Sequence, residues 1–185
     1  RRRPPAPPRP PAAPPAVPRR LMPPPLATRP VDEARALVAM MLEIRAIRFT
    51  PEQVAVSFTL DLTNEGSVAA TGLMIRIALG QGSAMPEAVL MRFFDGAGGS
   101  VLRDDIMLAP GASGRVSSDV ILPRSAIEPL MIGGKPMLVP VLAFDVTYHW
   151  DGTGDAFGQS AASFVLGRPP APGAGDKLAP LPLDR

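Results

Sequence analysis

Few side chains in this sequence could do chemistry, and they lie far apart. His149 is the only histidine among 185 residues, and there is no cysteine. Thiolate zinc sites, disulfides and cysteine nucleophiles are therefore excluded, and one imidazole alone makes a poor transition-metal site. A hydrolase would have to use His149 as its base, yet no serine lies in a nucleophile elbow. We expect no catalytic residue, no cofactor and no enzyme activity.

Acidic residues offer one candidate metal site. Asp151 and Asp155 flank Gly152-Thr153-Gly154, and their oxygens could hold Ca²⁺. An EF-type loop needs further acids and a distal Glu that this segment does not have. A tight hairpin, with Asp and Gly at positive φ, explains the same letters. We expect the hairpin, and binding of Ca²⁺ or of a small molecule is the alternative.

The other carboxylates are not arranged as acid–base pairs. Asp104 and Asp105 are adjacent, and adjacent side chains on a strand point to opposite faces of the sheet. Asp145 alternates with apolar residues, so we expect its carboxylate to point outward, away from them. The sequence also contains no Gly-x-Gly-x-x-Gly or Walker motif for phosphate binding.

Strands must position these residues. The clearest is Gln53–Asn64, in which five apolar side chains alternate with small or polar ones: Val54, Val56, Phe58, Leu60 and Leu62. A period of two is typical of a half-buried strand. An earlier strand, 42–49, slips in phase near Ala46, which predicts a β-bulge. Its upstream part, 32–41, could instead form a short helix.

Further elements follow the same reasoning. Strands are predicted at 73–79, 101–108, 115–122, 142–150 and 160–166. Tyr148 and Trp150 lie two apart, so we expect both rings against the core with their polar atoms near the strand end. A helix is predicted at Pro86–Phe94, because a proline lies near its start and Asp95-Gly96 ends it. Pro123–Leu130 is predicted to form a single helical turn.

These elements predict an all-β fold. Seven or so strands separated by turn signals indicate an immunoglobulin-like antiparallel β-sandwich of about seven strands with a short crossover helix. A small barrel is the structural alternative. The helix at 86–94 and the turn at 123–130 would then be crossovers at an end of the sandwich.

Composition divides the chain into three parts. Residues 1–31 hold seven Arg and no acid, and residues 1–30 contain 13 prolines. Proline lacks an N–H and fixes φ, so this arm is predicted to be a disordered, extended spacer. Residues 32–167 are the predicted sandwich domain, and 168–185 are a predicted irregular tail rich in Pro and Gly.

Charge argues against a nucleic-acid partner. The chain after residue 31 has 12 basic and 17 acidic residues, so the body is mildly acidic. The arm is basic but has no aromatic residue to stack on bases. A basic arm of this kind favours anionic surfaces, or serves as a soluble tether.

Two long connections, 81–100 and 123–137, are the candidate interaction loops. Long loops on a rigid sandwich are where binding residues concentrate. The candidates are four apolar side chains from the first loop and one cation from the second: Met85, Met91, Phe93, Phe94 and Lys135. The alternative is that the apolar side chains only cover one open end of the sandwich.

A series of short phrases carries a resemblance to a known family. They are Leu62-Thr63-Asn64-Glu65-Gly66, Leu108-Ala109-Pro110-Gly111, Leu122-Pro123-Arg124, Met137-Leu138-Val139-Pro140-Val141, Tyr148-His149-Trp150-Asp151-Gly152, Phe164-Val165-Leu166-Gly167 and Asp176-Lys177-Leu178-Ala179-Pro180. In this order, over 35–182, the chain resembles a set of uncharacterised alphaproteobacterial proteins. Those proteins have one N-terminal membrane helix, an Arg- and Pro-rich stalk and an immunoglobulin-like domain. The resemblance implies this architecture and membrane attachment, and no reaction.

The start of the chain fits that expectation. A run such as Arg1-Arg2-Arg3 is typical of the cytoplasmic flank of a membrane helix, so a helix missing from this sequence would precede Arg1. The domain would then lie on the cytoplasmic side, which we favour over the periplasmic side. We therefore expect a non-enzymatic, membrane-tethered module for protein interaction or envelope structure, with a protein partner of unknown identity.

Overall fold

The computed structural model describes residues 34–150, 156–170, 172–173, 175 and 177–184. The chain divides into two units, Arg1–Glu33 and Ala34–Arg185. The first unit lies outside the described residues, and with it the arm that was predicted to be an extended spacer.

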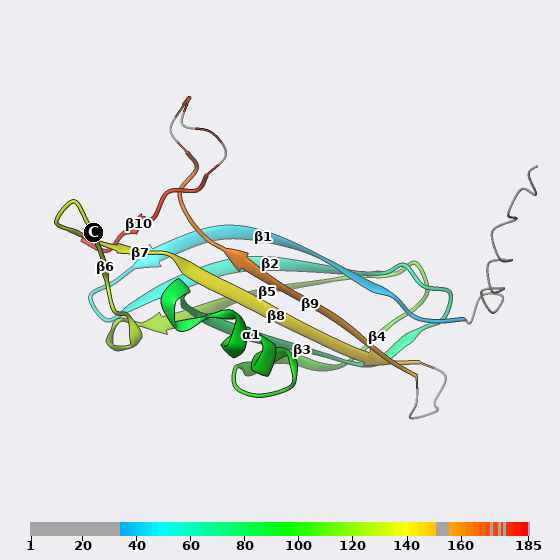
Figure 1. Cartoon of the computed structure of the whole chain (residues 1–185). Coiled ribbons are helices and arrows are strands. Elements are labelled where there is room, and N and C mark those ends of the chain that lie inside the picture. The colour runs from blue at the N-terminus through cyan, green and yellow to red at the C-terminus, as the bar shows by residue number, and fades with distance from the viewer. Residues whose placement is uncertain (1–33, 151–155, 171, 174, 176, 185) are drawn as a thin grey trace, which may run out of the picture. The chain divides into compact units, whose positions relative to one another are not determined.

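The described residues form mostly strands, with one short α-helix and two 3₁₀ turns (Figure 1). In chain order they are β1 (Val38–Phe49), β2 (Gln53–Asn64), β3 (Ala70–Gln81), η1 (Gly82–Ala84), α1 (Glu87–Phe94), β4 (Ser100–Leu108), β5 (Ser113–Pro123), η2 (Arg124–Ala126), β6 (Leu130–Ile132), β7 (Lys135–Leu138), β8 (Pro140–His149), β9 (Phe157–Val165) and β10 (Leu181–Pro182). The predicted all-β class with one short helix is confirmed.

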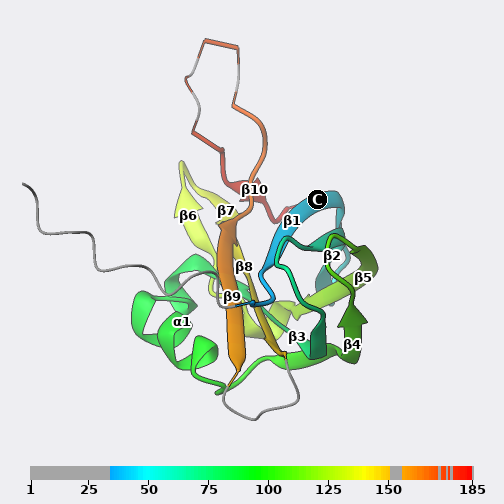
Figure 2. The ribbon, with the colours of Figure 1, turned by 90° about the vertical axis from the view of Figure 1, so that its right-hand side faces the viewer.

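The long strands form two antiparallel sheets that pack face to face (Figure 2). One sheet has the order β1-β2-β5, and the other has the order β4-β3-β8-β9. The short strands make a third sheet in the order β10-β7-β6. β4 and β5 are consecutive in the chain but lie in opposite sheets, so the turn 109–112 carries the chain across the sandwich.

The sandwich core lies where the predicted apolar strand faces meet. All five alternating apolar side chains of β2 are buried, with at most 2% exposure. Phe58 of β2 contacts Phe144 of β8 edge-on, with 5.3 Å between the ring centroids. Burying a large apolar side chain contributes about 1.5–3 kcal/mol, so this shared core is the main source of stability.

β1 shows how closely the backbone follows the apolar pattern. Its pairing with β2 changes register between Ile44 and Ala46, which confirms the predicted bulge. The extra residue restores Ile47 to the inward face after the phase slip. β1 begins at Val38, so residues 38–41 are strand and not part of the short helix that was considered for 32–41.

The side chain of Tyr148 links the end of β8 to the start of β1 by a hydrogen bond. Its ring is buried, and its hydroxyl oxygen accepts a hydrogen bond from the backbone N–H of Val38 at 3.1 Å. Gly158 of β9 gives the ring its space, since a Cβ there would collide with it. Trp150 lies half-buried beside Tyr148, with 6.2 Å between the ring centroids.

Asn64 holds together the loops at one end of the sandwich. Its side chain is fully buried and makes four hydrogen bonds. The amide nitrogen donates to the carbonyl oxygens of Val68 (2.8 Å) and Leu108 (3.0 Å). The amide oxygen accepts from the N–H groups of Leu37 (3.2 Å) and Gly66 (2.9 Å). The phrase Asn-Glu-Gly is therefore a structural junction between the entry to β1, the turn after β2 and the end of β4.

The described part of the tail, which was predicted to be irregular, contains strand pairing. Leu181–Pro182 pairs with β7 as β10, and Arg168 bridges to Ala179. Leu183 is buried in a second small apolar cluster with Val54, Leu122 and Leu138. Apolar side chains at the end of the described chain therefore close one end of the sandwich, which the Pro- and Gly-rich composition did not indicate.

Candidate functional site

The helix α1 lies on the outer face of the four-stranded sheet, against β3 and β8 (Figures 1 and 2). Both crossover elements were predicted, and both form: α1 starts after Pro86, and η2 makes the single turn. The expected position of the helix at an end of the sandwich differs from this placement. The sequence predicts the helix from local signals, but the face that it covers depends on residues of β3 and β8.

The candidate interaction residues of the first loop divide into two groups. Phe93 is buried with 3% exposure, and Phe94 and Met85 are half-buried. Met91 points outward from α1 with 53% exposure. These residues do not form one exposed patch. Met85 and Phe93 instead line an apolar groove.

This apolar groove, of about 360 Å³, lies between α1, β3 and the end of β5. We call it the α1 groove. Its walls are the side chains of Ile77, Leu79, Met85, Val89, Phe93 and Ile121, together with the backbone of Gly98 and Gly99. No charged side chain among the described residues lines it, and its volume falls in the range of about 300–1,000 Å³ that is usual for ligand pockets. The groove is therefore suited to apolar groups.

One wall of the α1 groove is a free edge of β3. In the described chain, β4 pairs with β3 only as far as Ile77 and Ser100. β8 continues on the other side of β3 as far as Gln81. Just beyond the end of β3, the N–H of Gly82 donates to the carbonyl oxygen of Val139, the residue before β8, at 2.7 Å. Hydrogen-bonded and non-hydrogen-bonded residue pairs alternate along antiparallel strands, so Gly80 and Ala78 bond to β8 and Leu79 does not. The N–H and C=O of Leu79 therefore point away from β8, toward the side that β4 leaves open.

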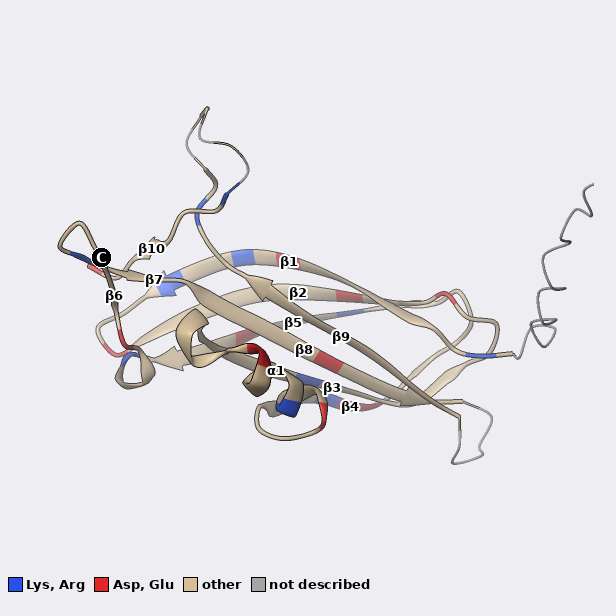
Figure 3. Ribbon diagram, viewed as in Figure 1, with Lys and Arg blue, Asp and Glu red and all other residues tan. Residues whose placement is uncertain are grey.

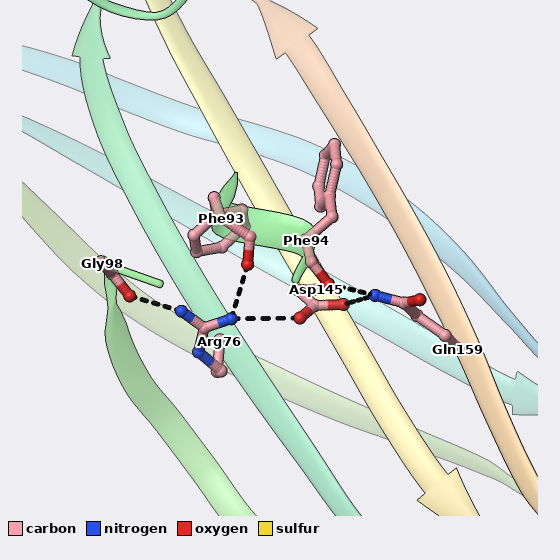
Figure 4. A network of polar contacts seen from close by, with 6 residues as sticks. All are labelled: Arg76, Phe93, Phe94, Gly98, Asp145 and Gln159. Atoms are coloured by element: carbon pink, nitrogen blue, oxygen red, sulfur yellow. Dashed lines mark hydrogen bonds and ion pairs between the residues drawn. The ribbon is translucent and has the colours of Figure 1, made fainter. Parts of the chain in front are cut away.

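A network of polar contacts lies under α1 and forms its anchor (Figure 4). Arg76 of β3 and Asp145 of β8 are direct cross-strand partners, and their side chains form an ion pair at 3.1 Å with 8% and 3% exposure. Arg76 also donates to the carbonyl oxygens of Phe93 (2.8 Å) and Gly98. Its guanidinium lies over the Phe93 ring, 4.7 Å from the ring centroid.

Gln159 of β9 completes the network on the other side of Asp145 (Figure 4). Its amide nitrogen donates to Asp145 at 2.7 Å and to the carbonyl oxygen of Phe94 at 2.8 Å. Among the described residues, no buried side-chain nitrogen or oxygen lacks a partner. The network is thus closed, and it is arranged to hold α1 rather than to bind a ligand.

Asp145 was predicted to point outward, and it does lie on the face away from the core. It is nevertheless buried, with 2% exposure, because α1 and the following loop cover that face. The signal that could have revealed this was the pair of opposite charges, Arg76 and Asp145, each in the middle of an apolar strand. Charges at such positions are rarely buried unless they are paired.

The second loop forms a hairpin with an exposed apolar strand. Lys135 is exposed at the start of β7, next to the Gly133-Gly134 turn, where both glycines have positive φ. β6 lies at the edge of its small sheet, and its three side chains are all exposed: Leu130, Met131 and Ile132. Such an edge strand favours pairing with another chain.

The structure does not bring together the candidate residues for chemistry that it describes. His149 is exposed and contacts Phe157 edge-on at 5.4 Å. Asp104 and Asp105 are both exposed, and Asp105 has a φ of 53°, at a change of register between β3 and β4. The described residues contain no group of three or more His, Cys, Asp or Glu placed to hold a metal ion. Asp151 and Asp155 lie outside the described residues.

Charges on the described strands are mixed in sign (Figure 3). On the outer face of the β1-β2-β5 sheet, Arg115 donates from Nε to Asp61 at 2.7 Å across neighbouring strands. The hydrogen bond and the charge of Asp61 raise the pKa of Arg115. This exposed pair has the same residue types as the Arg76–Asp145 pair, on the opposite sheet.

Comparison with known proteins gives distant structural neighbours only. No family model matches the chain, and no curated protein matches it. The protein assigned as ApaA from Bordetella pertussis is similar at 18% identity and a TM-score of 0.42, over 71% of this chain and 94% of that one. A β-glucosidase from Kluyveromyces marxianus is similar at 16% identity and a TM-score of 0.29, and the match covers 78% of this chain and 15% of the glucosidase. None of the helices in the described residues has the length and apolar character to cross a membrane.

Proposed function

We propose that this chain is a non-enzymatic, membrane-tethered β-sandwich module that binds an extended segment of a partner protein in the α1 groove. The partner segment would lie beside Leu79 in the position that β4 leaves open, and add a short strand to the sheet. Its backbone would pair with the N–H and C=O of Leu79, and its apolar side chains would enter the groove.

The observation that carries the proposal is a free strand edge beside an apolar groove. Backbone hydrogen bonds at such an edge supply affinity, and pockets for alternate side chains supply specificity. The groove has apolar side chains from three elements, α1, β3 and β5. The free stretch of β3 is short, because the strand ends at Gln81. There the side chain of Gln81 accepts a hydrogen bond from the N–H of Glu128 at 2.6 Å, which holds another segment beside the end of the strand. This contact limits the bound segment to a few residues.

The membrane tether is the second part of the proposal. It is supported by the resemblance to the alphaproteobacterial stalked proteins and by the basic arm, which holds seven Arg and no acid in residues 1–31. Such an arm is attracted to anionic lipid at the cytoplasmic surface, so the cytoplasmic side is favoured over the periplasmic side. The sandwich would then present its groove to proteins near the membrane.

We also assign the sandwich to the immunoglobulin-like class. Counted along the chain, the seven long strands of the described residues have the order 1-2-5 in one sheet and 4-3-6-7 in the other. A constant-type immunoglobulin domain has the order 1-2-5-4 and 3-6-7. The two orders differ only in the fourth strand, which here pairs with the third. That change leaves β5 as a sheet edge next to the α1 groove.

Selection of random peptides displayed on phage, with the purified full chain as target, tests the binding proposal. We expect the selected peptides to share alternating apolar residues. Ile121→Glu places a carboxylate at the groove, and burial of an unpaired charge is strongly unfavourable, so it should raise their Kd by about tenfold or more. Val165→Glu is the matched control, since Val165 is as exposed as Ile121 (57% and 51%) but lies on β9.

Two further results decide the outcome. Amide hydrogen exchange at Leu79 should slow when a selected peptide binds, because the peptide accepts a hydrogen bond from that N–H. Peptides that bind the Ile121→Glu variant as well as the wild type, or a selection that gives no enriched sequence, would contradict the proposal.

A further inference from the structure

We infer that Arg76 is a positioning residue for the α1 groove, and that the network around it holds α1 in place without being needed for the sandwich itself. The link to peptide binding rests on the proposed function, whereas the link to α1 does not. Two residues that line the groove, Phe93 and Gly98, are also the backbone acceptors of Arg76.

The position of the charges is the first step of the argument. Arg76 and Asp145 lie on the outer face of the sheet, opposite to the sandwich core formed by their neighbours Ile75, Ile77 and Phe144. Without α1, this pair would be at the surface, where an ion pair contributes little to stability. α1 and the loop after it are what bury the pair.

The weak intrinsic stability of α1 is the second step. A helix of eight residues is marginal on its own, and Phe93 is the only residue of α1 that is buried. Helix ends leave their last carbonyl groups without intrahelical partners, and a cation near those carbonyls complements the helix dipole. Arg76 donates to the carbonyl oxygen of Phe93, which also accepts from the N–H of Gly96 at 3.0 Å, and Gln159 donates to the carbonyl oxygen of Phe94.

The energetics of buried ion pairs are the third step. Replacing such a pair by apolar residues of similar volume is often neutral or stabilising, because the desolvation cost disappears together with the attraction. The Arg76–Asp145 pair is therefore poorly suited as a source of global stability. Its specific effect is geometric, since Arg76 fixes the C-terminal end of α1 and the 95–99 loop, and with them one wall of the groove.

The double variant Arg76→Met/Asp145→Leu tests this inference in the full chain. We expect a melting temperature close to that of the wild type, and exchange of the Asp95 and Ala97 amides that is about tenfold faster or more, as expected when hydrogen bonds to a charged group are lost. Both amides close the end of α1, with acceptors at Met91 and Arg92. The Kd of a selected peptide should rise together with this exchange.

Arg115→Met/Asp61→Leu is the matched control, because it removes a cross-strand pair of the same types from the other sheet. It should change neither α1 exchange nor peptide binding. If the first double variant does not fold, Gln159→Leu replaces it. This variant removes one donor to the carbonyl oxygen of Phe94 from an exposed position, and should still speed exchange at Asp95.

The possible results separate the two proposals. Wild-type exchange rates at Asp95 and Ala97 in the folded variant would overturn the inference, whether or not peptides bind. If the Asp95 and Ala97 amides exchange faster in the variant but no peptide binds even the wild type, the result would support the role of Arg76 in holding α1. It would at the same time contradict the proposed function. An unfolded Arg76→Met/Asp145→Leu variant would overturn the claim that the sandwich does not need the network. Wild-type exchange in Gln159→Leu would then overturn the anchor of α1 as well.

Discussion

Gly158 is required by its neighbour rather than by its own backbone. Its φ is not positive, yet a Cβ at this position would collide with the ring of Tyr148. Tyr148 in turn is fixed by burial and by its hydrogen bond with Val38. The glycine therefore leaves the space above β9 that the ring of its cross-strand partner, Tyr148, occupies.

Gly158→Ala should destabilise the protein by about 1–3 kcal/mol, the usual cost of overpacking. This outweighs the gain of about 0.5–1 kcal/mol that loss of a glycine brings to a strand. Urea unfolding followed by the fluorescence of Trp150 measures the change. Ser163→Ala, at an exposed position of the same strand, should stay within about 0.5 kcal/mol of the wild type. Equal stability of all three proteins would show that Gly158 does not confine the Tyr148 ring.

At the scale of the element, the free edge of β3 predicts a specific exchange pattern. The amides of Ala78 and Gly80 face β8, whereas the amide of Leu79 faces the side that β4 leaves open. In the free protein, we expect Leu79 to exchange at least about tenfold faster than its two neighbours. Hydrogen exchange resolved by NMR tests this directly. Equal protection at all three positions would mean that another group covers the edge.

β6 is an edge strand of the small sheet. Its three residues are all exposed and apolar, and an unprotected edge of this kind promotes association between chains. We expect Met131→Lys to reduce concentration-dependent self-association of the protein, measured by sedimentation. Met91→Lys, at a similarly exposed methionine of the helix α1 (53%, against 61% for Met131), should have a smaller effect. If both variants behave alike, general charge and not the β6 edge controls association.

At the scale of the whole molecule, the second apolar cluster links the tail to the sandwich. Leu183 is buried with 6% exposure, and its carbonyl oxygen accepts a hydrogen bond from Arg124 at 2.8 Å. Leu183→Ala should cost about 2–4 kcal/mol, as for other large-to-small core substitutions. Leu178→Ala, at a residue with 49% exposure, should cost less than about 1 kcal/mol. Thermal or urea unfolding of the two variants compares them.

The sequence predicted the features that local periodicity determines. The alternating face of β2, the bulge near Ala46 and the end of α1 at Asp95-Gly96 all depend on residues close together in the chain. The position of α1, the burial of Asp145 and the return of Leu183 could not be predicted, because each depends on contacts between distant segments. Of the candidate site, Met85 and Phe93 were identified from composition, but the free edge at Leu79 depends on where β4 stops pairing.

The order of synthesis gives the tail a further role. β10 and Leu183 come after every other strand of the described residues, and they close the small cluster around Val54, Leu122 and Leu138. Until Leu183 is made, those three side chains lack one of the apolar residues that pack against them in the folded domain. A chain that ends before Leu181 should therefore expose these side chains and associate with other chains more than the full chain does, and sedimentation of the two forms measures the difference.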